Sequence, residues 1–212
     1  GELRILTSMG REDELNFNYY QPVDLEARWF VNPELRAKRQ TFTLWDRDAR
    51  AAEFEIAGWD ASLGVGRNFG TSDELRLTYR YGRSDADLLI GLFPPLPDDR
   101  IRIGELELSY LHDSQDSLYF PTEGSTHHLR YRYADDALGS EADYQQAAAV
   151  GSFVFSRGKN TGLMNYEFGY SVDDEVPASR WFQLGGLGRL SGLAPDQLLG
   201  PQAGLVTVAY YR

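Results

Sequence analysis

The sequence predicts an all-β fold of antiparallel strands, and three observations support this prediction. Apolar and polar residues alternate with a period of two along most of the 212-residue chain, as they do on strands with one apolar and one polar face. Turn-forming clusters that contain Gly, Pro or Asn separate the alternating runs. No segment carries a convincing helical period.

Ten strands are predicted, each from its own alternation. In one run Leu15, Phe17 and Tyr19 alternate with asparagines, and in another Met164 and Phe168 lie on the face opposite Asn165 and Glu167. The predicted strands, in chain order, are 1–9, 14–23, 27–45, 50–69, 73–90, 101–116, 125–135, 142–157, 161–172 and 201–212.

The fourth strand contains a change of parity. Phe54 and Ile56 share one face, whereas Trp59, Leu63 and Val65 share the other. A β-bulge inserts one residue and would bring both groups to the same face. We therefore predict a bulge near residues 57–58.

The connections differ in length. Tight turns are predicted at 21–24, 69–72, 120–125 and 157–160, whereas 91–100 and 173–200 are longer. Short turns at one end of the strands and longer loops at the other are typical of outer-membrane barrels.

Composition limits the class of protein. A net charge of −11 argues against a nucleic-acid partner, because phosphate binding needs a basic face. The absence of Cys excludes disulfides and thiolate metal sites. No apolar run reaches the roughly 18 residues that a membrane-spanning helix needs, but barrel strands are shorter and only half apolar.

The strand faces favour a membrane barrel over a soluble β-sandwich. Charged residues are frequent on the polar faces, Tyr, Phe and Trp are frequent on the apolar faces, and several strands exceed the usual five or six residues. We predict an antiparallel up-and-down transmembrane β-barrel segment in the bacterial outer membrane, with residues 1–212 as one partial barrel domain. A soluble β-sandwich, which alternates in the same way, is the alternative.

Two segments carry a family resemblance. Residues 113–125, DSQDSLYFPTEGS, resemble a periplasmic hairpin in barrels of the bacterial surface antigen superfamily, the outer-membrane assembly and translocation factors. Residues 181–193, WFQLGGLGRLSGL, look like the sixth extracellular loop of those barrels. The hairpin residues that carry the likeness are Asp113, Asp116, Phe120, Pro121 and Gly124. The loop residues that carry it are Gly185, Gly186, Arg189, Leu190, Ser191, Gly192 and Leu193.

The likeness covers nearly the whole chain and is closest to the barrel half of patatin-like outer-membrane proteins, a branch of type V secretion. This closer likeness rests on residues 1–4, 20–22, 190–193 and 208–212. It implies a sixteen-stranded barrel, of which this chain would supply strands three to twelve. It also implies that loop 173–200 folds back into the lumen.

One departure from the family pattern concerns this loop. Many members carry an Arg-Gly-aromatic motif whose arginine pairs with a carboxylate on a later strand, but Ser191, Gly192 and Leu193 stand at the corresponding positions here. The resemblance therefore predicts neither the family's arginine–carboxylate contact nor an insertase activity for this chain. Arg189, two residues earlier, is a candidate replacement that would reach Glu105, Glu107 or Glu167.

The loop composition predicts a buried position. Six leucines lie between residues 184 and 199, and burying their apolar area would stabilise a packed loop. Gly185, Gly186 and Gly192 would allow close backbone approach. Asp196 is a second candidate partner for Arg189.

No residue pattern predicts catalysis or a cofactor. Asp113 and Asp116 fit turn-amide acceptors better than a cation site or an acid–base pair. His112, His127 and His128 lack a spaced third ligand for a metal, and Gly186, Gly188 and Gly192 miss the dinucleotide-binding spacing. No Gly-x-Ser-x-Gly nucleophile elbow occurs, so a patatin-like lipase would lie in a domain outside this chain.

The function predicted is non-enzymatic. The chain would contact outer-membrane lipid, anchor an attached passenger or lipase domain, and display or translocate it. A passive outer-membrane channel and a soluble β-sandwich binding module are the alternatives. Polar residues facing the lumen are expected both in an open pore and in a packed, hydrogen-bonded barrel interior, so both remain alternatives.

Overall fold

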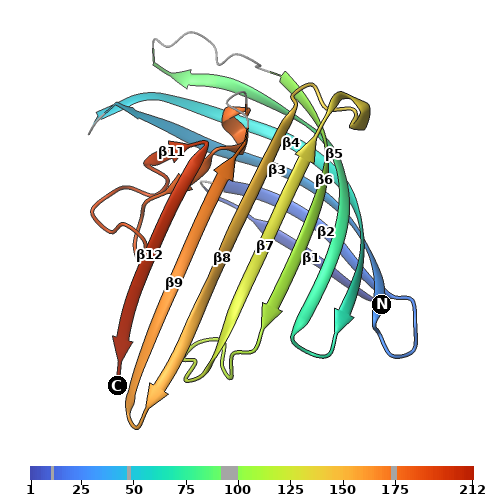
Figure 1. Cartoon of the computed structure of the whole chain (residues 1–212). Coiled ribbons are helices and arrows are strands. Elements are labelled where there is room, and N and C mark those ends of the chain that lie inside the picture. Colours follow the sequence, from blue (N-terminus) through green and yellow to red (C-terminus); the bar gives the residue numbers. More distant parts are fainter. Residues whose placement is uncertain (11, 47–48, 92–99, 173–175) are drawn as a thin grey trace.

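The computed structural model describes residues 1–10, 12–46, 49–91, 100–172 and 176–212. Ten strands form one antiparallel sheet in the order β1-β2-β3-β4-β5-β6-β7-β8-β9-β12, and each strand follows its neighbour along the chain. Figure 1 shows this sheet curling strongly, so that β1 and β2 lie behind and β12 lies in front. The strands are β1 (Glu2–Ser8), β2 (Glu12–Pro22), β3 (Trp29–Asp46), β4 (Ala49–Phe69), β5 (Asp73–Ile90), β6 (Arg100–Asp113), β7 (Gly124–Ala134), β8 (Tyr144–Arg157), β9 (Asn160–Ser171) and β12 (Gln202–Tyr211).

All ten predicted strands are present, within a few residues of their predicted ends. They form a single curved sheet, whereas a β-sandwich needs two sheets packed face to face, so the sandwich alternative is wrong. The sequence did not predict the short strands β10 (Phe182–Leu184) and β11 (Leu198–Gly200), which pair with each other. It also missed two 3-10 helices, η1 (Asp136–Leu138) and η2 (Ala178–Arg180).

The alternation produces two faces of different character. On β5, Leu77 is 52% exposed on the convex face, and Thr78 is 7% exposed on the concave face. The register continues this division across strands, since Leu77 is opposite Leu108 of β6 and Thr78 is opposite Glu107. Cross-strand neighbours therefore match in polarity, which stabilises this register.

The bulge predicted near residues 57–58 is wrong. Ala57 and Gly58 pair in unbroken register with Asp85 and Ser84 of β5, and the register shifts between Glu53 and Phe54 instead. The change of parity has another cause. Phe54 is buried on the concave face in an apolar cluster with Ala52, Leu44, Ile56 and Leu199, whereas Trp59 is exposed on the convex face.

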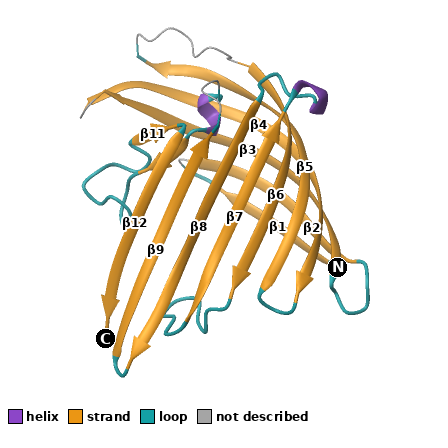
Figure 2. Ribbon diagram, in the orientation of Figure 1, coloured by secondary structure: helices purple, strands orange, loops and turns teal. Residues whose placement is uncertain are grey.

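The connections lie at two ends of the sheet (Figure 2). Three-residue or shorter connections join β4 to β5 and β8 to β9 at one end, and the loop from β9 to β12 lies at the other. Most of the predicted loop 91–100 lies outside the described residues. None of the helices in the described part of the chain is long and apolar enough to cross a membrane.

Candidate functional site

The loop between β9 and β12 has a defined structure of its own. Beyond the β10–β11 pair, a bridge joins Gly186 to Leu190, and the amide of Gly186 donates to the carbonyl of Leu193 at 3.3 Å. Figure 1 shows β11 beside β12, on the side of the sheet toward β3 and β4. Residues 173–175, at the start of the predicted loop, lie outside the described residues.

A buried carboxylate on β6 holds the first part of this loop. Glu105 is 0% exposed, and its Oε1 accepts from Arg80 at 3.1 Å and lies 3.2 Å from Arg180 of η2. The hydroxyl of Tyr144 donates to the other carboxylate oxygen at 2.5 Å. A buried carboxylate is tolerated only when it is paired and hydrogen-bonded, so Arg180 contributes to satisfying Glu105.

Apolar contacts surround this ion pair. Tyr144 packs with Ile101, Ile103, Ala134 and the loop residue Val176, and Trp181 covers this cluster. The indole of Trp181 donates to the carbonyl of Val176 at 3.0 Å. The loop therefore contributes both charge and apolar area to the concave face.

The far end of the loop reaches another part of the wall. Leu199 on β11 packs against the buried Phe54 and Ala52 of β4. Phe182 of β10 lies over Gly169 of β9, where an added Cβ would come within 2.4 Å of its ring. The loop thus crosses the concave face from β9 toward β4.

Arg189 makes a second polar attachment. Its guanidinium donates to Glu167 Oε1 of β9 at 2.6 Å and to the carbonyl of Gln183 at 2.7 Å. Glu167 is one of the three carboxylates named from the sequence, whereas the pairing with Asp196 is absent from the described contacts of Arg189. Glu167 is only partly buried, so this contact is more solvated than the one at Glu105.

The glycines and leucines predicted to be packed in the loop differ in burial and in the space around them. Gly185 has φ +137° and lies against the carbonyl of Ala194, so a side chain there would clash. Gly192 has open space around it, and close backbone approach was wrongly predicted there. Ser191 is exposed, Leu190 and Leu193 are partly buried, and Leu187 is 95% exposed because it lies at the tip of a turn.

The hairpin between β6 and β7 is built on two aspartates. Asp116 accepts from the amides of Thr122 at 2.7 Å and Glu123 at 3.2 Å, and Asp113 accepts from the amide of Gln115 at 3.1 Å. Gly124 has φ +100° and lies against the carbonyl of Ser114. These contacts use both carboxylates to close a turn.

The aromatic part of this hairpin reaches the last strand. Phe120 is 76% exposed and packs edge-on against Tyr211 of β12, with ring centroids 6.4 Å apart. The Tyr211 hydroxyl donates to the carbonyl of Pro121. Pro121 is itself buried.

The three histidines do not converge. His112 and His127 stack with centroids 5.6 Å apart, but His128, the next residue on β7, points to the opposite face. No group of three or more metal-ligating side chains occurs within the described ranges. His112 instead contacts Asp73 at 2.9 Å.

Comparison with known proteins decides the family. A family model described as the Omp85 superfamily domain matches residues 2–204. The chain belongs to the Omp85 superfamily. No curated protein matches it in sequence.

A solved structure supports the fold. The chain is similar to BamA from Haemophilus ducreyi lacking POTRA domains 1-3, with 18% sequence identity and a TM-score of 0.67. The similarity covers 88% of this chain and 38% of that one, so the chain spans little more than a third of the BamA chain. This Omp85 chain is an outer-membrane β-barrel segment, and its convex face contacts lipid.

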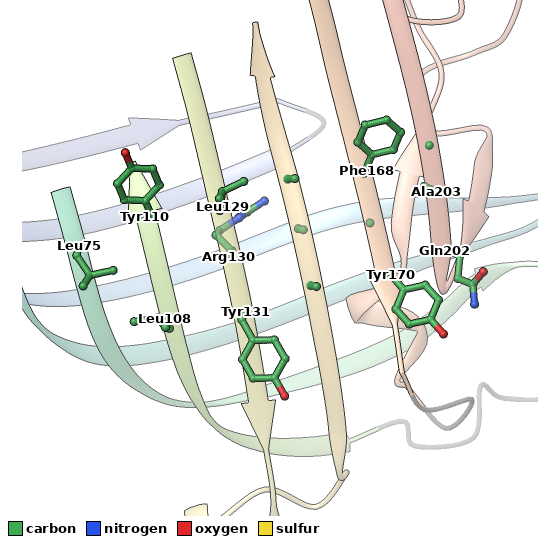
Figure 3. Close-up of a pocket in the computed structure, with 15 residues that line it drawn as sticks. Leu75, Leu108, Tyr110, Leu129, Arg130, Tyr131, Phe168, Tyr170, Gln202 and Ala203 are labelled. Atoms are coloured by element: carbon green, nitrogen blue, oxygen red, sulfur yellow. The ribbon is translucent and has the colours of Figure 1, made fainter. Parts of the chain in front are cut away.

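The convex face of this Omp85 chain carries a shallow groove of about 880 Å³. Ala147 and Ala149 on β8 line it, and the register places Ala147 between Tyr131 of β7 and Tyr170 of β9, and Ala149 opposite Phe168 of β9. Figure 3 shows the rings of Tyr131, Phe168 and Tyr170 along the groove. Its position on the apolar face places it against membrane lipid.

Sequence reasoning missed Arg180 and Tyr144, and it named Trp181 only as part of the loop segment 181–193, without a contact. Arg180 is the strongest omission, because it contacts the buried Glu105. In the sequence Arg180 is a single cation beside Trp181, and the predictions for this loop rest on its glycines and leucines. The residues around Arg180 in the sequence do not indicate that its guanidinium contacts a carboxylate on β6.

Proposed function

We propose that this chain is the wall of an Omp85 barrel that anchors an attached domain in the outer membrane and displays or translocates it, with loop 173–200 restricting the lumen. The observation that carries the proposal is the attachment of the loop across the concave face. Arg180 meets Glu105 of β6, Arg189 meets Glu167 of β9, and Leu199 meets Phe54 of β4.

These attachments make the loop a removable obstruction. Ion pairs and a small apolar cluster can be exchanged for contacts with a passing segment without disrupting the wall strands, whose backbone hydrogen bonds are independent of the loop. The attached domain in this proposal belongs to the patatin-like branch of type V secretion, as the sequence resemblance implies. We assign no catalytic role to the chain itself.

The test is a display assay in the full-length protein. Arg180→Ala removes the loop side of the buried pair, and Arg157→Ala at the exposed end of β8 is the matched control. We expect Arg180→Ala to change the surface exposure of the attached domain, measured by protease shaving of intact cells, while heat-modifiable mobility shows a folded barrel. Unchanged exposure with a normal barrel level would contradict the proposal.

A passive channel is the second candidate, favoured by the charged concave face. For this function, Arg180→Ala should raise single-channel conductance in planar bilayers and leave domain display unaffected. The two assays together therefore separate the candidates.

A further inference from the structure

Arg130 on β7 differs from its concave-face neighbours Arg80 and Arg132. The register places Arg132 opposite Glu107 and Arg80 opposite Glu105. Arg130 instead lies between Ser109 of β6 and Ala148 of β8. Its cross-strand neighbours are therefore small and supply no negative charge.

The described residues offer Arg130 no free carboxylate. No hydrogen bond or ion pair of its guanidinium occurs within the described chain, and its Nε is buried without an acceptor. The acidic groups that influence it most are Glu107 and Glu167, which are bonded at 2.6 Å to Arg132 and Arg189. A partly buried cation without a partner is unfavourable unless an anion joins it.

A polar pocket of about 350 Å³ lies in front of these residues, and Arg130, Arg132, Arg80, Arg180 and His128 contribute to its lining. Four lining arginines, at positions 36, 80, 132 and 180, pair with three carboxylates, Asp60, Glu105 and Glu107, and the fifth, Arg130, pairs with none of them. The other two lining cations are Lys38, which pairs with Glu12, and Arg83, which shares Asp85 with Arg100. These seven lining cations therefore exceed their five carboxylate partners by at least two charges, in a chain whose net charge is −11.

We propose that this pocket binds a phosphate group, either inorganic phosphate or a soluble phosphate monoester, with Arg130 as its main ligand. Guanidinium groups match phosphate oxygens through paired N–H donors. A phosphate dianion balances the two surplus charges, whereas a carboxylate balances only one. The pocket faces the lumen rather than the lipid, so its ligand comes from solution. This site does not depend on the translocation role.

The test is thermal unfolding of the full-length protein in nonionic detergent, with sodium phosphate titrated at constant ionic strength. Binding to the folded state raises the melting temperature as phosphate increases. We expect Arg130→Gln to weaken the apparent phosphate affinity at least tenfold, and to be no less stable than the wild type without phosphate. Arg157→Gln, at the exposed end of β8, should respond as the wild type does.

Three results would overturn the proposal. The first is an equal phosphate response in Arg130→Gln and Arg157→Gln. The second is a loss of stability in Arg130→Gln without phosphate, which would indicate a partner within the protein. The third is an Arg130-dependent response to acetate, or to phosphatidic acid but not to inorganic phosphate.

A measurement on the wild type avoids any folding defect of the variants. Phosphate should slow the modification of Arg130 by phenylglyoxal, followed by mass spectrometry, and leave the rate at Arg157 unchanged. Absence of protection at Arg130 would also overturn the proposal.

Discussion

At the scale of single residues, burial decides which polar contacts matter. Glu105 with Arg180 and Glu2 with Arg4 are both carboxylate–arginine pairs, but Glu105 is 0% exposed whereas Glu2 and Arg4 are more than half exposed. Water and salt screen the exposed pair, so its contribution to stability is small. The buried pair leaves an uncompensated charge when one partner is removed.

Glu105→Gln should therefore destabilise the folded chain by roughly 3–5 kcal/mol, because Arg80 and Arg180 lose their shared carboxylate in a buried site. Denaturant unfolding from detergent or lipid measures the free energy. Glu2→Gln is the matched control and should change it little. Equal effects of the two substitutions would show that the burial of Glu105 does not determine its contribution.

Asp116 gives a pH-dependent prediction in the hairpin outside the strands. Hydrogen bonds from the side chain and amide of Thr122 and from the amide of Glu123 lower the pKa of Asp116. A lowered pKa means that the turn is stabilised above the unfolded-state pKa of about 3.9 and loses this stabilisation as pH falls through the lower folded value.

Amide hydrogen exchange at Thr122 and Glu123 should report this change. After correction for intrinsic exchange, protection should decrease at acidic pH in the wild type. Asp116→Ala should have low protection at every pH. A wild-type protection that is constant down to the lowest measurable pH would argue against the role of the carboxylate.

At the scale of elements, one face of each strand contacts lipid and the other faces the lumen. Leu77 lies between Val65 of β4 and Leu108 of β6 on the lipid face. Its neighbour Thr78 lies between Gly64 and Glu107 on the lumen face. The same substitution at adjacent positions therefore has unequal costs.

Leu77→Arg should cost about 2–4 kcal/mol near the membrane midplane. Thr78→Arg should cost much less, because its side chain faces the polar lumen rather than lipid. Reversible unfolding into and out of lipid vesicles measures both free energies. Equal costs would contradict the assignment of the two faces.

At the scale of the whole molecule, the sheet order leaves one edge each of β1 and β12 without a strand partner among the described residues. Unpaired strand edges recruit other chains, and the convex face adds a broad apolar surface that is exposed in water. A curved sheet of this kind is suited to lipid and to closure by further strands.

The 212-residue chain alone should therefore aggregate in buffer and become dispersed in detergent. Size-exclusion chromatography with light scattering, run with and without detergent, measures this difference. A monodisperse monomer in plain buffer would be incompatible with a lipid-facing convex surface.

The sequence by itself determined the ten strands, their order of pairing and the polarity of their faces, because a period of two is a local property that each strand carries. It also indicated the Asp-based hairpin, since Asp113 and Asp116 bond amides a few residues away.

Only the tertiary structure decided how the loop meets the wall. The pair of Arg180 with Glu105 and the contact of Leu199 with Phe54 join segments that are far apart in the chain, and no local pattern specifies such partners. The same reason explains the misplaced bulge. Phe54 and Ile56 face the lumen because a distant leucine covers them there, and periodicity alone assigned every apolar residue to the lipid face.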